Sequence, residues 1–329
     1  MRANPDLPLD VIGVGNAIVD VIANVSDAFL TEHGLVKGAM TLIDTDRATS
    51  LYGAMPPGIE ASGGSAANTM AGVASLGGRA AYIGKVRDDQ LGEVFRHDTQ
   101  SGGVAFDVPA ATDGEPTARS LIQVTPDGER TMNTFLGISA HLTPDDIDRA
   151  TVASAAVTYC EGYLWDRPEA KDAIRHAMAV ASDAGRIVSL TLSDAFCVDR
   201  HRAEWLDLID DSVDLVFANE AEVCSLFETD DFDVAGRQLA EMVEVVALTR
   251  AAAGSVVLSE GGERTVVPAA PVERVVDATG AGDLFAAGFL FGLSAGVSLT
   301  RCAEIGAMAA AEVISHVGAR PQVELASLF

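Results

Sequence analysis

The sequence predicts an α/β protein with a doubly wound, mostly parallel sheet, helices on both faces, and a small second β-sheet. From about residue 138 onward, short apolar runs alternate with segments whose apolar residues recur at helical spacing. This alternation is typical of βαβ units, which build parallel sheets. The hairpin-like pieces nearer the N-terminus do not fit the alternation, so we expect them to form the second sheet.

The N-terminal part is expected to contribute strands to both sheets. Residues 10–25 are expected to form a strand that is interrupted at residues 13–16, where two glycines and an asparagine occur. We also expect strands in residues 36–44 and 79–86, and helices in residues 63–76 and 90–101. The runs 120–124 and 131–135 flank a Pro126-Asp127-Gly128 turn, which indicates a hairpin.

The C-terminal part is expected to supply most of the large sheet. Strands are expected in the second half of residues 151–160 and in residues 186–192, 215–218, 245–249, 255–259 and 264–267. Helices are expected in residues 168–184, 219–227, 234–242, 280–293 and 299–315. The chain is therefore expected to be a single domain, residues 1–329, with lid segments at roughly 17–45 and 104–136 inserted in the α/β core.

The charge of the chain excludes some classes of partner. The formal net charge is −26, so the protein repels nucleic-acid backbones and anionic membranes. Lysine occurs only at positions 37, 85 and 171, so any bound phosphate would depend on arginine, backbone amides or a metal. The four cysteines form no CxxC pair, and neither a signal peptide nor a long apolar run is present. We expect buried thiols and a cytoplasmic protein.

The strongest local signal runs from Asp277 to Asp283, where a turn of small residues opens into an apolar helix. Gly280 and Gly282 let a ligand approach the backbone, and the free amides from Gly280 through Ala281 to Gly282 form an anion hole that suits a phosphate. A carboxylate beside an anion hole would repel phosphate unless it takes part in the chemistry. Asp283 is therefore either a general base or an ordinary helix cap.

Three further short stretches carry polar groups that could bind a ligand. Gly64 and Asn68 begin a helix, where Asn68 offers a donor and an acceptor to a hydroxyl; the alternative is a plain glycine turn. Asn219 and Glu222 share one helical face and suit a hard cation or a first-turn cap. Asp20 interrupts an apolar run, so it faces solvent or accepts hydrogen bonds from a polyol.

Two nucleotide-binding motifs are rejected. Gly13-Val14-Gly15 begins like a dinucleotide fingerprint, but Ile18 occupies the third glycine position. Gly84-Lys85 is followed by Val86 where a P-loop requires Ser or Thr. The six histidines are scattered, and none is assigned a catalytic role.

Together these constellations resemble the PfkB, or ribokinase-like, family of carbohydrate and nucleoside kinases. Gly63-Gly64 with Asn68 resembles its N-terminal signature, residues 277–288 resemble its C-terminal signature, and Asn219 with Glu222 resembles its N-x-x-E motif. The match covers nearly the whole chain in the family's order. The resemblance implies a doubly wound α/β domain with a β-sheet lid over the acceptor site. It also implies transfer of the γ-phosphoryl group of Mg-ATP to a primary hydroxyl.

The resemblance also implies roles for individual residues. Asp283 would be the catalytic base, and Asp20, Gly64 and Asn68 would bind acceptor hydroxyls. Asn219, Thr249 and Gly254 would bind the nucleotide, Glu222 would organise Mg²⁺ through water, and Asp277 matches a position that helps to bind a monovalent cation such as K⁺. Ala251 replaces the first glycine of a T-x-G-x-x-G turn.

The acceptor is predicted from shorter stretches. Residues 15–20 and 125–132 resemble segments of adenosine kinases, so phosphorylation of adenosine to AMP is the leading hypothesis. Phe135, Leu136 and Ile138 would either line a base slot or pack the hinge. A ribokinase-, fructokinase- or 2-keto-3-deoxygluconate kinase-type enzyme is the alternative, and a non-catalytic sugar- or nucleotide-binding regulator represents a different class. Relatives are monomers or dimers joined through the lid.

Overall fold

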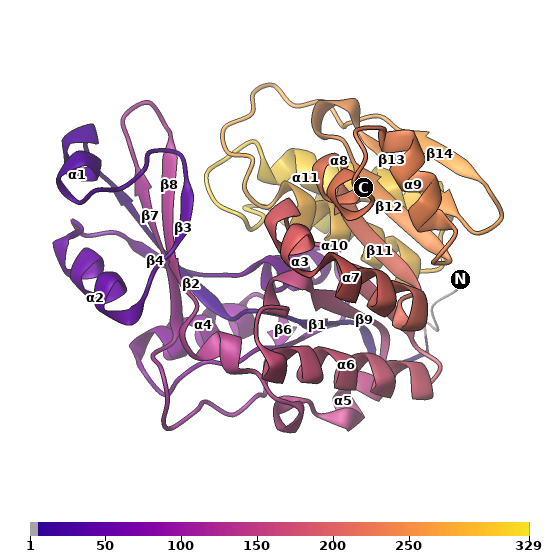
Figure 1. The fold of residues 1–329 in the computed structure, drawn as a ribbon, viewed down its shortest axis with the longest axis horizontal. Coiled ribbons are helices and arrows are strands. Elements are labelled where there is room, and N and C mark those ends of the chain that lie inside the picture. Colours follow the sequence, from indigo (N-terminus) through magenta and orange to yellow (C-terminus); the bar gives the residue numbers. More distant parts are fainter. Residues whose placement is uncertain (1–5, 329) are drawn as a thin grey trace.

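A nine-stranded sheet forms the centre of the computed structural model, which describes residues 6–328 (Figure 1). Its order is β14-β13-β12-β11-β10-β9-β1-β5-β6, and all neighbouring strands pair parallel except β13, which is antiparallel to both β12 and β14. The strands are β1 (Leu9–Val14), β5 (Ala80–Ile83), β6 (Val104–Ala105), β9 (Ala155–Glu161), β10 (Ile187–Thr191), β11 (Leu215–Asn219), β12 (Val245–Thr249), β13 (Ser255–Ser259) and β14 (Arg264–Val267). The predicted fold class, a mostly parallel α/β sheet, is confirmed.

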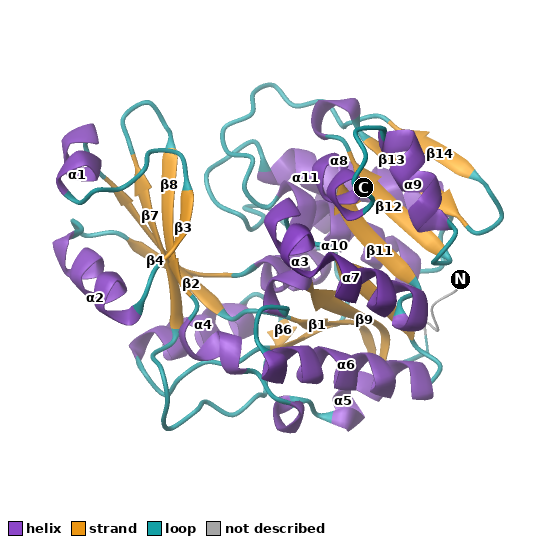
Figure 2. Ribbon diagram, in the orientation of Figure 1, coloured by secondary structure: helices purple, strands orange, loops and turns teal. Residues whose placement is uncertain are grey.

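Helices cover both faces of this sheet (Figure 2). One group packs together against one face: α3 (Ser65–Ser75), α10 (Ala281–Ser294) and α11 (Leu299–Val313). The other face carries α5 (Arg149–Ala153), α6 (Pro168–Asp183), α7 (Ala195–Ser212), α8 (Glu220–Leu226) and α9 (Phe232–Ala240). All seven residues of β9 are buried, as expected for a strand that is covered on both faces.

The carboxyl end of β1 is the point where the fold changes direction. β1 pairs with β5 on one side and with β9 on the other, so the chain builds the sheet outward in both directions from it. In open α/β sheets, a crevice opens at such a point and binds ligands. The interruption that the sequence shows at residues 13–16 lies at this crevice.

The second sheet stands beside the first and has the order β3-β8-β7-β2-β4 (Figure 1). Its strands are β2 (Ile18–Asn24), β3 (Met40–Leu42), β4 (Ile59–Gly63), β7 (Ala118–Val124) and β8 (Arg130–Phe135). The helices α1 (Asp27–Glu32) and α2 (Thr45–Ala54) accompany it, and Leu51 of α2 is buried against Val21 and Leu121. We call this five-stranded sheet the lid.

Several elements differ from the prediction. β4 lies outside the two predicted lid segments, and β6, at the start of the second segment, pairs in the large sheet. The helices α1, α2, α5 and α7 were not predicted, and α4 (Gln90–Ser101) contacts both β6 and β4. Cys160, Cys197 and Cys302 are buried free thiols, whereas Cys224 is half-buried because it lies near the exposed side of the short helix α8. No helix within residues 6–328 is apolar over a length that could cross a bilayer.

Candidate active site

The N-terminus of α10 is open to a ligand. Gly280, its N-cap, has φ +82°, and a Cβ there would lie 2.8 Å from the backbone of Ala319, so only glycine fits. No side chain caps this helix start. A Cβ on Gly282 would meet nothing within 4 Å, so the space in front of this residue is free. The amide of Ala281 donates weakly to the carbonyl of Ala278 at 3.3 Å, whereas the amides of Gly280 and Gly282 have no partner in the described part of the chain and are available to an anion.

The N-terminus of α3 lies next to that of α10. Gly64, its N-cap, has φ +94°, and a Cβ there would collide with the carbonyl oxygen of Asn16. This helix start also lacks a side-chain cap, but the amide of Ala66 donates to Glu161 at 2.9 Å. Glu161 is buried at the end of β9 and also accepts from the Asn16 side chain at 3.0 Å. The start of α3 is thus held by a residue of the large sheet.

Asp283 joins the two helix starts. Its carboxylate accepts hydrogen bonds from the Ser65 hydroxyl at 2.7 Å and from the Asn68 amide at 3.1 Å, both of which belong to α3. It therefore does not cap its own helix. Burial raises the pKa of Asp283 above its ordinary value, although the two hydrogen bonds act to lower it. Such a carboxylate, beside an anion hole, is suited to accept a proton.

Asp20 faces the same crevice from the lid. It lies on one face of the lid with Ser120 and Thr134, its neighbours across β7 and β8. Gly63 leaves room for its carboxylate, because a Cβ there would lie 2.6 Å from Asp20 Oδ2. Burial raises the pKa of Asp20 to about 6, against the opposing charges of Arg130 and Arg320. The polar residue in the apolar run is therefore half-buried and lies outside the lid's own core, which contains its neighbour Val21.

Asp277 bridges the lid and the large domain. It forms an ion pair with Arg130 of β8, and it accepts from the amides of Thr279 and Gly318, each at 3.0 Å. Burial acts to raise its pKa, but these hydrogen bonds and the charge of Arg130 hold the pKa below its ordinary value. Both carboxylate oxygens are thus engaged by protein cations or amides, so this donor set does not fit a monovalent cation in the arrangement seen here.

The residues expected on the nucleotide side lie together at the ends of β11 and β12, where Asn219 and Thr249 are register partners. Asn219 and Glu222 form a capping box: Glu222 N donates to Asn219 Oδ1 at 2.9 Å, and Asn219 N donates to Glu222 Oε2 at 2.9 Å. Burial raises the pKa of Glu222 to about 7. The cap that was the plain alternative for this pair is therefore present.

The turn that follows β12 keeps the shape of a glycine turn despite its alanine. Ala251 has φ +46° and Gly254 has φ +86°. A Cβ on Gly254 would collide with the carbonyl oxygen of Val267. Position 251 thus adopts the left-handed conformation that glycine favours, at a cost to a residue with a side chain.

Four residues in or beside the crevice were not singled out from the sequence: Ser65, Arg130, Glu161 and Arg320. Ser65 lies within a quoted motif, so its position in the first turn of α3 was a usable signal. Arg130 likewise lies within the quoted segment 125–132, whereas Glu161 and Arg320 come singly from β9 and the C-terminal segment, with no local pattern to mark them. Phe135 and Ile138 are buried and Leu136 is half-buried, and a Cβ on Gly137 would lie 2.8 Å from the Phe135 ring. Phe135 and Ile138 are thus enclosed by protein atoms, which both alternatives, a base slot and hinge packing, allow.

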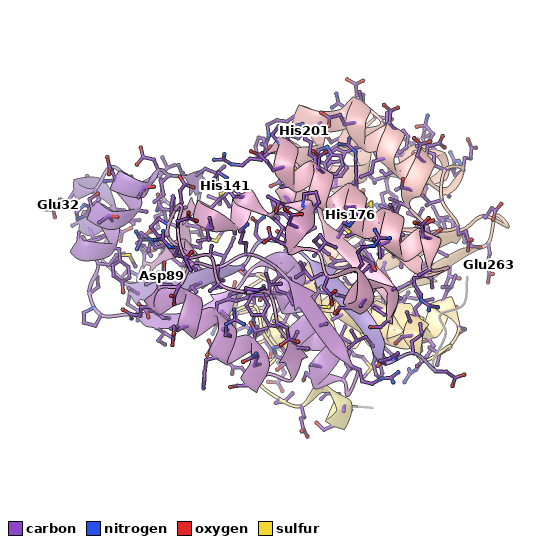
Figure 3. All side chains as sticks on the ribbon, turned by 90° about the horizontal axis from the view of Figure 1, so that it is seen from below. Glu32, Asp89, His141, His176, His201 and Glu263 are labelled. Carbon is purple, nitrogen blue, oxygen red and sulfur yellow. The ribbon has the colours of Figure 1, made fainter. Side chains whose placement is uncertain are left out.

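The histidines do not converge. His141, His176 and His201 lie on three separate helical elements (Figure 3). In the part of the chain that the structure describes, no three His, Cys, Asp or Glu side chains are grouped as ligands for a metal ion. A divalent cation would therefore need most of its ligands from water and a bound phosphate.

Comparison with known proteins gives a consistent picture. Residues 58–325 match the family model described as pfkB family carbohydrate kinase. A solved adenosine kinase from Sinorhizobium meliloti is 55% identical, with 97% of this chain and 98% of that chain covered and a TM-score of 0.90. A probable sugar kinase from Rhizobium etli is 50% identical, with 98% of both chains covered and a TM-score of 0.91. The adenosine kinase of Saccharomyces cerevisiae is 27% identical over 94% of this chain and 95% of that protein.

Proposed function

Since the chain belongs to the PfkB family of carbohydrate kinases and is a kinase, we propose that it transfers the γ-phosphoryl group of ATP to the primary hydroxyl of a nucleoside, adenosine. The observation that carries the chemistry is the position of Asp283. Its carboxylate lies beside the uncapped amides of α10, where a phosphoryl group and an attacking hydroxyl would meet.

Each part of the crevice has a proposed role. Asp283 accepts the proton of the acceptor hydroxyl, which contributes a factor of roughly 10²–10⁴ to the rate. The amides from Gly280 to Gly282 stabilise the negative charge on the transferring phosphoryl group. Ser65 and Asn68 hold the Asp283 carboxylate in one orientation, and Gly64 lets the acceptor lie against the backbone.

Membership of the family supports ATP as the co-substrate. The metal ion that accompanies ATP is proposed from the oxygen donors that the site contains. Glu222 is an oxygen ligand of the type Mg²⁺ prefers, but both its oxygens already accept from Asn219. It fits a water-mediated role, in which Mg²⁺ would neutralise phosphate charge in a strongly acidic protein. Asn219, Thr249 and Gly254 are proposed to contact the nucleotide.

Adenosine is proposed over a sugar because of the Sinorhizobium relative, a named adenosine kinase that matches 97% of this chain. The Rhizobium relative, a probable sugar kinase at 50% identity, favours the second candidate, a sugar kinase. Asp20 suits the hydroxyls of either acceptor, because ribose and free sugars both present them. Phe135 and Ile138 do not decide between them.

The test is ADP release by the purified protein with Mg-ATP and adenosine, with ribose, fructose and 2-keto-3-deoxygluconate in parallel. Turnover that depends on adenosine supports the full proposal. Turnover with a sugar alone contradicts the nucleoside acceptor but keeps the role of Asp283. Binding of adenosine or ATP without ADP release would instead support the non-catalytic regulator.

A further inference from the structure

The C-terminal segment after α11 enters the crevice between the starts of α3 and α10. Ala319 packs against Gly280, and the amide of Gly318 donates to Asp277 at 3.0 Å. The next residue, Arg320, donates from Nε to Asn68 Oδ1 at 3.3 Å. A guanidinium is thus placed directly beside the residues proposed to hold the acceptor.

This guanidinium is incompletely paired. Arg320 Nη2 is buried and has no hydrogen-bond partner among the described residues. Asp20 and Asp98 act on Arg320 electrostatically, but neither forms an ion pair with it in the described part of the chain. Asp20 likewise forms no hydrogen bond with any described residue. Asp98 already accepts a hydrogen bond from the amide of Ser62 at 3.0 Å. A buried charged donor is normally paired, so Arg320 Nη2, with the half-buried and unpaired Asp20 carboxylate acting on it, points to a missing partner.

The chemistry of that partner follows from the surroundings. Two separate charged groups, one a donor and one an acceptor, are satisfied together by a hydroxyl, which accepts one hydrogen bond and donates another. A phosphate or carboxylate on the acceptor would have to lie among Asp20, Asp98 and Asp283, which would repel it. A neutral, hydroxyl-bearing ring fits this setting better than an anionic one.

We propose that Arg320 is an acceptor-binding residue that determines specificity. Its Nη2 donates a hydrogen bond to the oxygen of a ring hydroxyl of the acceptor. An O–H of the same pair of ring hydroxyls donates a hydrogen bond to the Asp20 carboxylate. This inference rests on the proposed kinase function and deepens it, because it assigns recognition of a secondary hydroxyl to a residue outside the sequence motifs. Arg320 also keeps its bond to Asn68, so it connects the acceptor with the group that orients Asp283.

The experiment compares acceptors with and without the hydroxyl. Wild type, Arg320→Met and Arg320→Lys are assayed for kcat and KM with Mg-ATP and adenosine, 2′-deoxyadenosine or 3′-deoxyadenosine. Ribose and 2-deoxyribose are run in parallel, so that the ratio is read with whichever acceptor the wild type uses. Arg96→Met is the control, because Arg96 is a half-buried arginine that donates to the carbonyls of Phe106 and Val108, outside the crevice.

Wild type should prefer the full acceptor over at least one deoxy analogue by about 10- to 100-fold in kcat/KM. In Arg320→Met the preference should fall to within a few-fold, chiefly because KM for the full acceptor rises. Arg96→Met should keep the wild-type preference. An equal fall in kcat for all acceptors, with the preference intact, would overturn the proposal and leave Arg320 as a support for Asn68. A wild type that phosphorylates no acceptor would overturn the kinase proposal itself, a distinct result.

Discussion

The starts of α3 and α10 have the same local form but opposite surroundings. Both begin at a glycine with positive φ and no side-chain cap, whereas most other helices begin with a Ser, Asp or Asn that caps them. At α3 the free amide of Ala66 is taken by the buried Glu161. At α10 no carboxylate within residues 6–328 accepts from the corresponding amide of Gly282, and a Cβ on this residue would meet nothing within 4 Å.

The difference shows how one device can serve structure in one place and ligand binding in another. An uncapped helix start attracts a negative charge whichever molecule supplies it. Where the fold supplies a carboxylate, the helix is locked to the sheet. Where it does not, the helix start is left to a phosphate. Asp283 lies between the two, because it belongs to α10 but accepts its hydrogen bonds from α3.

The largest expected effect comes from removing the group that joins the two helix starts. Asp283→Asn should lower kcat by roughly 10²–10⁴ because the amide cannot accept the proton. The fold should survive, since the substitution removes a half-buried charge whose pKa burial already raises. Steady-state ADP release and a thermal melt measure both. If the variant keeps more than about a tenth of the wild-type kcat, Asp283 is not the general base.

The second prediction separates the two glycines of α10. Gly282→Ala should fold normally, because its Cβ meets nothing within 4 Å, but the methyl group enters the space proposed for phosphate. We expect kcat/KM for ATP to fall by about 10²-fold. Gly280→Ala is the comparison: with φ +82° and Ala319 in contact, it should lose about 1–3 kcal/mol of stability. Equal melting temperatures for the two variants would contradict the geometry.

The third prediction tests the hydrogen bond that Ser65 of α3 donates to Asp283. Ser65→Ala removes the hydrogen bond to the Asp283 carboxylate, which favours the ionised form. The pKa of Asp283 should therefore rise, and the acidic limb of the kcat/KM profile should move up by on the order of one pH unit. Ser75→Ala, the same change at the other end of α3, should leave the profile in place. An unshifted limb in Ser65→Ala would show that Asp283 does not govern it.

The fourth prediction concerns the carboxylate that locks α3. Burial raises the pKa of Glu161 from 4.5 to about 7, so the folded protein holds a proton that the unfolded chain releases. Its contribution to stability is complete below pH 4.5 and is lost as the pH rises to about 7, at up to about 1.4 kcal/mol per pH unit.

Glu161→Gln removes this titration. Its melting temperature should therefore decline less than that of the wild type between pH 5 and pH 8, although it starts lower where the new amide nitrogen faces the Ala66 N–H. Parallel slopes in the two proteins would rule out a proton held at Glu161. The strong negative charge acts on both proteins alike, so the difference between slopes isolates this residue.

The smallest effect is expected away from both helix starts. Ala251→Gly should raise the free energy of unfolding by about 0.5–1 kcal/mol, because φ +46° suits glycine and not alanine. Urea unfolding at fixed pH measures the change. A destabilised variant would mean that the entropy lost by glycine on folding outweighs the relief of strain.

Most of the fold could be predicted because the spacing of apolar residues and the length of each apolar segment distinguish strands from helices. Strands such as β9 are long apolar runs, and helices such as α6 carry a regular apolar face. β4 was missed because Ile59–Gly63 contains only one large apolar residue and two of its five residues are Ser and Gly. α7 was missed because its helix is interrupted near His201, where φ is −128°.

The residues of the candidate site likewise fall into those that could be predicted from the sequence and those that could not. Residues that lie in one short stretch, such as Gly280, Gly282 and Asp283, form a local pattern that can be recognised. Glu161 and Arg320 each arrive alone from distant parts of the chain, and only tertiary structure brings them to the crevice. The partners of Asn68 could not be predicted either, since Asp283 is 215 positions away.

The path of the chain through the lid has a consequence for its motion. The chain passes between the large sheet and the lid four times: from β1 to β2, from β4 to α3, from β6 to β7, and after β8. Four connections tether the lid to the large sheet more firmly than one or two would, so the lid cannot move independently of the segments that form the crevice. Asp20 and Arg130 belong to the same sheet, so a movement of the lid as one body would displace the proposed acceptor contact and the Asp277 ion pair together.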